Sequence, residues 1–119
     1  MTLSEAIRLG AMLRPQAFGV KFDGVGTCAL GAALDASGAL GMSETVEAKR
    51  YREWNLNAWF QEATCPECGR IRSLFMEGTI PHLNDKHRWT RERIADWVET
   101  IEQQQDQPTA QPDAVKVVA

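Results

Sequence analysis

The stretch CPECGRIRSLFMEGTIPHLNDKH, residues 65–87, carries the chemistry that decides how this chain folds. It holds Cys65 and Cys68, separated by two residues, and then His82 and His87, the only two histidines in the chain. Thirteen residues lie between the second cysteine and the first histidine, and four lie between the histidines. This spacing is typical of a four-ligand zinc site. The sequence therefore predicts one zinc ion per chain, bound by these four side chains.

The number of ligands also predicts the kind of site. Four protein ligands favour a structural zinc ion, because a catalytic zinc keeps one position open for water or substrate. Residues five apart on a straight helix point about 140° away from each other, so we expect His87 to lie at a frayed or tightened helix end. The alternative is a redox pair of Cys65 and Cys68 beside two unrelated histidines, which is typical of a βαβ context that this sequence does not show.

The same residues bear a resemblance to a known family. The segments CPECGRI and HLNDKHRWTRERIADW resemble the zinc finger of the bacterial Ros/MucR-type transcriptional regulators, over residues 65–97. The shared positions are Cys65, Cys68, Gly69, His82, Leu83, His87, Thr90, Glu92 and Trp97. The resemblance implies a zinc-stabilised ββα unit with a helix for DNA, although the interval between Cys68 and His82 is longer and the basic flanks are thinner than in that family. Residues 80–99 are also similar to a segment of small uncharacterised bacterial and phage proteins.

Caps and apolar periodicity predict a mainly α-helical chain around this segment. Thr2 followed by Glu5 forms a capping box and predicts a helix that stops before Pro15. Thr27 and Ser43 are candidate N-caps for a short apolar helix over 28–36 and for helical structure from residue 44 to residue 62. Further helices are expected from 78 to 86 and from 91 to about 104, the latter capped by Thr90. The apolar face of this last helix is predicted to comprise Ile94, Trp97, Val98 and Ile101.

The predicted fold is therefore mainly α with a small β-hairpin at residues 63–76. A helical N-terminal part, residues 1–62, is expected to pack on a C2H2-like zinc unit with a C-terminal helix, residues 63–104. Residues 105–119 are polar, contain two prolines and lack an amphipathic period. They are predicted to form a disordered tail.

Composition excludes several classes of protein. The 119 residues are 44% hydrophobic and 24% charged, with a net charge of −3, which is close to the globular average. No apolar run approaches the ~18–20 residues that cross a bilayer, and the N-terminus lacks the features of a secretory signal. Three cysteines fit poorly with a disulfide framework. We therefore expect a cytoplasmic protein without a membrane partner.

A group of basic residues predicts a possible nucleic-acid contact around Trp89. The group comprises Arg70, Arg72, Lys86, Arg88, Arg91 and Arg93. Arginine beside an aromatic ring can hold phosphates and stack on bases. However, residues 65–102 carry six basic and seven acidic groups, and the alternative is a solvated face with Trp89 packed against the zinc unit.

Three hypotheses for function follow. The leading one is a small non-enzymatic zinc-binding protein whose structural zinc site supports a helical surface for a protein partner, with Trp59 and Phe60 as candidate contacts. The second is a DNA-binding regulator of the Ros/MucR type. The third is an enzyme that uses Cys28 as a nucleophile at a helix N-terminus, but both histidines that could serve as its base are assigned to zinc, so a buried structural Cys28 is favoured. No small-molecule substrate is evident.

Overall fold

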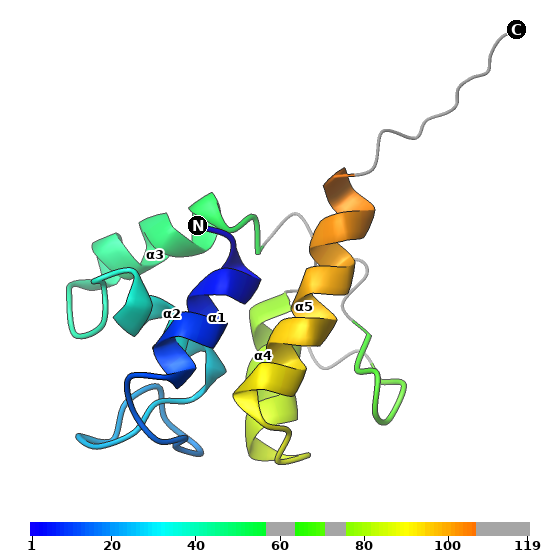
Figure 1. Cartoon of the computed structure of the whole chain (residues 1–119), viewed down its shortest axis with the longest axis horizontal. Coiled ribbons are helices and arrows are strands. Elements are labelled where there is room, and N and C mark those ends of the chain that lie inside the picture. Colours follow the sequence, from blue (N-terminus) through cyan, green and yellow to red (C-terminus); the bar gives the residue numbers. More distant parts are fainter. Residues whose placement is uncertain (57–63, 71–75, 107–119) are drawn as a thin grey trace, which may run out of the picture.

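Five α-helices form the fold in the computed structural model, which describes residues 1–56, 64–70 and 76–106. They are α1 (Leu3–Ala11), α2 (Ala29–Ala36), α3 (Glu44–Glu53), α4 (Met76–Asp85) and α5 (Arg91–Asp106). Helix α1 packs against α2 and α5, and α4 packs beneath them against α2 and α5 (Figure 1). The prediction of a mainly helical chain is confirmed, and none of the helices in the described ranges is long and apolar enough to cross a bilayer.

The helix starts follow the predicted caps, with one exception. The capping box of Thr2 and Glu5 is present, and Ser43 caps α3 by accepting a hydrogen bond from the amide of Val46. Thr27, however, does not cap α2. The cap is Cys28, whose Sγ accepts from the amide of Gly31 at 3.4 Å. The hydroxyl of Thr27 instead lies in the interior, where it accepts a hydrogen bond from an arginine distant in the sequence.

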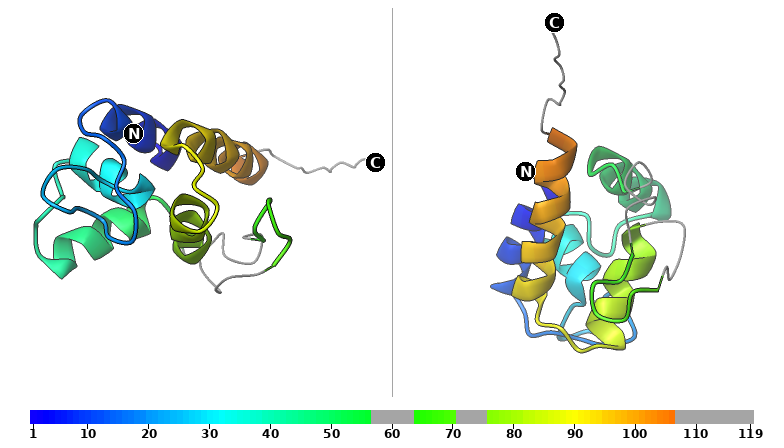
Figure 2. Two further views of the ribbon diagram at one scale, coloured as in Figure 1. Left: turned by 90° about the horizontal axis from the view of Figure 1, so that it is seen from below. Right: turned by 90° about the vertical axis from the view of Figure 1, so that its right-hand side faces the viewer.

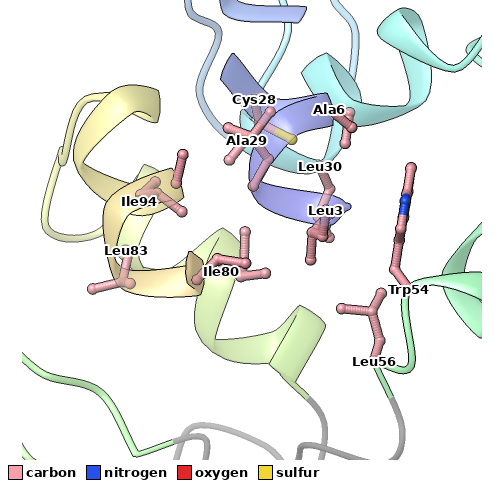
Figure 3. Packing of buried hydrophobic residues seen from close by; sticks show 14 of the residues in the cluster. Leu3, Ala6, Cys28, Ala29, Leu30, Trp54, Leu56, Ile80, Leu83 and Ile94 are labelled. Atoms are coloured by element: carbon pink, nitrogen blue, oxygen red, sulfur yellow. The ribbon is translucent and has the colours of Figure 1, made fainter. Parts of the chain in front are cut away.

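One buried apolar cluster joins the two predicted parts of the chain (Figure 3). Leu3, Leu30 and Leu34 come from the N-terminal part, and Ile80 and Ile94 come from α4 and α5. All are at most 4% exposed. The predicted apolar face of α5 is confirmed, since its isoleucines and valine are buried and its tryptophan is partly buried. Burial of this size is the main force that holds α4, and with it the histidines, against the rest of the fold.

Helix α1 fits closely between its neighbours because of small residues and polar links. A Cβ on Gly10 would lie 1.8 Å from the carbonyl oxygen of Ala32 in α2, so only glycine permits this approach. On the other side, both carboxylate oxygens of the buried Glu102 in α5 accept hydrogen bonds from Ser4, one from its amide and one from its hydroxyl. The bonds between Ser4 and Glu102 thus fix α1 to α5 through residues that are 98 positions apart in the sequence.

Several sequence predictions fall partly outside the described residues. The predicted hairpin has no strand within residues 64–70, which form a turn, and residues 71–75 lie outside the described part. Helix α3 ends at Glu53. The helical region was predicted to reach residue 62, but residues 57–62, which include Trp59 and Phe60, lie outside the described part of the chain. Helix α5 continues to Asp106, and the remainder of the predicted tail is not described.

The ends of the helices place two connections together. The long connection between α1 and α2 and the short one between α4 and α5 lie at the same end of the bundle (Figures 1 and 2). The turn at residues 64–70 lies beside α4, on the side away from α3 (Figure 2). Helix α4 is therefore flanked by this turn on one side and contacts the N-terminal part on the other.

Candidate metal centre

The two cysteines lie on a tight turn. The amide of Gly69 donates to the carbonyl of Cys65 at 2.8 Å, and the amide of Cys65 donates to the carbonyl of Arg70 at 2.9 Å. Gly69 has a φ of +75°, a conformation that glycine adopts without the penalty of a Cβ. The turn brings both thiols to one side, with Cys65 buried and Cys68 exposed. The Cys-x-x-Cys-Gly sequence predicts this geometry locally.

The two histidines lie at the C-terminal end of α4. His82 is in the last turn, and the helix ends at Asp85. The amides of Lys86 and His87 both donate to the carbonyl of His82, at 2.9 and 3.3 Å, so the chain widens instead of continuing the helix. The two rings are 4.5 Å apart between centroids and nearly perpendicular. The expectation that His87 lies beyond a regular helix is confirmed.

Helix α4 itself begins earlier than predicted. It starts at Met76, so Pro81 is its sixth residue and lies inside the helix instead of in its first turn. Proline there cannot donate the usual backbone hydrogen bond. The buried side chains of Ile80 and Leu83 on either side hold the helix against the core, and this packing outweighs the local preference.

The four predicted ligands come together and could hold a metal ion. One ligand atom from each of Cys65, Cys68, His82 and His87 lies within 4.8 Å of all the others. The Sγ of Cys68 is 3.6 Å from the Nε2 of His82. A tetrahedral zinc ion with ordinary Zn–S and Zn–N bonds separates a sulfur from a nitrogen by about 3.6 Å. The thiol and imidazole are therefore already at the distance that a shared ion requires.

The electrostatics of the site also suit a cation. The pKa of Cys68 is lowered from its usual 9.0 to about 6. The largest cause is a hydrogen bond from the backbone amide of Arg70, and hydrogen bonds with His82 and His87 contribute less. This thiol is thus mostly a thiolate at neutral pH, and the thiolate is the form that binds metals. The Nε2 of His87 is buried and finds no hydrogen-bond partner among the described residues. A buried ring nitrogen without a partner is costly unless something else fills that role.

The basic residues predicted to contact nucleic acid are spread over different environments. Arg70 and Lys86 are exposed and line the same surface hollow as Cys68, His82 and His87. Arg93 and Arg88 are also exposed, and each lies over an aromatic ring. Arg72 lies outside the described residues.

Two members of that group are in the interior. Arg91 is 6% exposed, and its guanidinium donates to Thr27 and to the carbonyls of Ala11 and Arg14. Trp89 is 7% exposed, and its Nε1 donates to the carboxylate of Glu67 at 2.7 Å. Neither side chain presents a surface to a ligand. The arrangement agrees with the alternative in which Trp89 packs against the cysteine turn.

Cys28 occupies a structural position. It is 5% exposed within the apolar cluster. Burial, the largest influence, raises the pKa of its thiol, and this outweighs the opposing hydrogen bond from Gly31. A nucleophilic cysteine requires the reverse shift, so the local environment favours the structural role.

Sequence reasoning missed two residues that support the site. Glu67 ties the cysteine turn to Trp89. Asn84, which is fully buried between the two histidines in sequence, bonds to the segment after α1. Both contacts join residues more than 20 positions apart, so no local sequence pattern predicts them.

A scan against protein-family models, a search of curated proteins and a search of solved structures each gave no match.

Proposed function

We propose that this chain is a small non-enzymatic protein that binds one structural zinc ion and serves as an interaction module for a protein partner. The observation that carries the proposal is the convergence of two thiols and two imidazoles within 4.8 Å. Zinc is favoured over other metals because two sulfur and two nitrogen ligands in a compact group are its usual structural set. With four protein ligands, no position remains for a substrate, which supports a structural role.

The zinc ion would join two segments that, within the described part of the chain, also meet through the Trp89–Glu67 hydrogen bond and through the burial of Cys65 in the apolar cluster. Cys65 and Cys68 hold it from the turn, and His82 and His87 hold it from the end of α4. The apolar cluster buries residues of α1, α2, α4 and α5 without the help of a metal. We therefore expect zinc to order the turn and the end of α4, and to add to the stability of a fold that this cluster also supports.

The test is metal analysis of the purified chain, with a chelator titration followed by circular dichroism and thermal unfolding. We expect about one zinc per chain and a lower unfolding temperature after chelation. Cys68→Ser should lose the metal. Cys28→Ala, which changes the cysteine that is not part of the metal cluster, should keep it. A chain purified without zinc that does not take it up, or a Cys68→Ser variant that binds zinc as tightly as the parent, would refute the site.

A protein ligand is supported by the character of the surface. Nine large hydrophobic side chains are 40% or more exposed among the described residues, and aromatic and apolar contacts form the centres of protein interfaces. The first test of this part is whether zinc-loaded protein binds a defined peptide ligand at all.

A DNA-binding regulator of the Ros/MucR type is the second candidate. It is supported by the position of Arg70 and Lys86, which line the same hollow as three of the ligands. A mobility-shift assay with mixed-sequence duplex DNA at several salt concentrations tests it, since phosphate contacts lose affinity steeply with salt. The variant for this assay is Arg70→Glu with Lys86→Glu, because both are exposed. DNA binding that is the same in the parent and in the double variant, or no DNA binding at low salt, would eliminate this candidate.

A further inference from the structure

The connection between α1 and α2 exposes apolar side chains instead of burying them. Within residues 18–25, which we call the apolar loop, four large hydrophobic residues are each at least 40% exposed. These are Phe18, Val20, Phe22 and Val25. Single exposed hydrophobic residues are ordinary on protein surfaces, but several in one short segment indicate a binding surface.

The backbone of the apolar loop is held in place by hydrogen bonds. The carboxylate of Asp23 accepts from the amides of Val25 and Gly26, at 2.9 and 2.7 Å. The carbonyl of Lys21 accepts from the amide of Cys28, and the amide of Gly19 donates to Asp85 near the end of α4. The loop is thus fixed to both α2 and α4. A preformed loop loses little conformational entropy when it binds a ligand.

One cation beside the loop has no carboxylate partner. The guanidinium of Arg88 lies 4.1 Å from the centre of the Phe18 ring, and no carboxylate in the described part of the chain forms an ion pair with it. The two other cations at this surface are already paired. Arg14, which lies over Phe22, bonds to Asp35, and Lys21 bonds to Glu47.

The backbone at Arg88 places this charge. Arg88 has a φ of +56°, a left-handed conformation that is uncommon for a residue with a side chain. The conformation turns the chain between α4 and α5 and brings the guanidinium over the ring of Phe18. Because the connection and the apolar loop share one end of the bundle (Figures 1 and 2), an unpaired positive charge and exposed apolar side chains lie next to each other.

We propose that the apolar loop and Arg88 form a docking surface for a peptide segment of a partner protein in which large apolar side chains stand next to a carboxylate. The apolar side chains would contact the loop, and the carboxylate would pair with the guanidinium over Phe18, a geometry that suits arginine. An anionic membrane is less favoured because it needs several free cations, and two of the three at this surface are already paired. This inference rests on the proposed interaction function and names its surface and ligand.

The test selects from a random-peptide library displayed on phage, with the full zinc-loaded chain as bait. We expect the enriched peptides to share an Asp or Glu beside large apolar residues. A synthetic peptide of that consensus is then titrated by fluorescence anisotropy. Phe18→Ser with Phe22→Ser should weaken its binding about tenfold or more, as for central interface residues.

Two further variants separate charge from general surface effects. Arg88→Gln keeps a side chain at the positive φ but removes the charge, and it should weaken binding about fivefold and reduce its salt dependence. Met42→Ser, at an exposed methionine outside the loop, should leave binding unchanged. Zinc content and the urea midpoint of every variant are measured on the same samples, so a folding defect is recognised.

Several results would overturn the inference. One is a library that yields no consensus, or a consensus without a carboxylate. Another is a peptide whose affinity is unchanged by the loop variants, which would leave the interaction function standing but place its surface elsewhere. Concentration-dependent dimers that Phe22→Ser abolishes would assign the loop to a second copy, and loop-dependent binding to phosphatidylserine vesicles would assign it to lipid. In each case zinc content reports separately on the metal site.

Discussion

Replacing Arg91 by methionine should destabilise this protein strongly, although the residue is a basic side chain in a basic segment. Arg91 is the first residue of α5, yet its guanidinium is directed at the end of α1 and at the start of α2. It donates at 2.8 Å to the carbonyl of Arg14, at 3.0 Å to the hydroxyl of Thr27, and at 3.3 Å to the carbonyls of Thr27 and Ala11. Arg91→Met keeps most of the side-chain length and removes these donors.

The size of the stability loss in Arg91→Met can be worked out from the contacts of the guanidinium. Each hydrogen bond from a charged donor contributes about 1.5–3 kcal/mol when well formed, and two of the four contacts with Arg91 are short. Burial lowers the pKa of the guanidinium, and this desolvation cost, which disappears in the variant, offsets part of the loss. Unpaired buried carbonyls add a penalty. We expect a net loss of about 3 kcal/mol, a large share of a stability that is typically about 5–15 kcal/mol.

The assay is urea unfolding of zinc-loaded protein, followed by circular dichroism, with Arg93→Met as the matched control. Arg93 is exposed, lies over the ring of Trp89 at 3.6 Å and should tolerate methionine with a change below about 0.5 kcal/mol. The melting temperature of Arg91→Met should fall by about 10 °C. A loss below about 1 kcal/mol, or equal losses in the two variants, would refute the role of Arg91 as a buried support.

Three further predictions concern the cysteines, the contact of α1 with α2, and the interior of α4. In metal-free protein at neutral pH, iodoacetamide should modify Cys68 long before Cys28, because the pKa of Cys68 is lowered to about 6 and that of Cys28 is raised by burial. The rate of Cys68 modification should fall when the pH drops below 6. Equal rates for the two cysteines would contradict the assigned environments. Gly10→Ala should lower the free energy of unfolding, measured by urea titration, by about 1–3 kcal/mol through its clash with Ala32. Helix propensity alone predicts a gain in stability, so a stabilised variant would exclude the close approach. Asn84→Ala should cost about 2–3 kcal/mol in the same assay, since it leaves a buried carbonyl and amide unpaired, and a neutral effect would remove its supporting role.

Local patterns sufficed for the metal cluster and for most helix starts. The cluster of two cysteines and two histidines was predictable because a turn and a helix end can bring two pairs of closely spaced side chains together. The capping box of α1 and the N-cap of α3 depend on residues three positions apart, and these too can be found in the sequence. Thr27 was misassigned for a different reason. Its hydroxyl satisfies the guanidinium of Arg91, 64 residues away, and the cap passes to the neighbouring Cys28.

The basic group around Trp89 shows where sequence composition stops being informative. Arg88, Arg91 and Arg93 are close in sequence and chemically identical, yet one lies on the Phe18 ring, one is buried among carbonyls and one lies on Trp89. Their environments are set by which helix end each meets after folding. Mutating Arg91 to glutamate as a test of nucleic-acid binding would therefore measure loss of the fold.

Asn84 gives the metal centre a physical connection to the apolar loop. It lies on α4, between His82 and His87 in the sequence, and is fully buried. Its side-chain oxygen accepts hydrogen bonds from the side chain of Gln16 at 2.8 Å and from the amide of Ala29 at 3.2 Å. Its own amide donates to the carbonyl of Ala17 at 2.9 Å, directly before the loop begins. A zinc ion that fixes the end of α4 would thus also fix the position of the residues that carry the loop. If both proposals hold, a structural metal at one side of α4 would support the proposed binding surface at the end of the bundle through Asn84, without touching it.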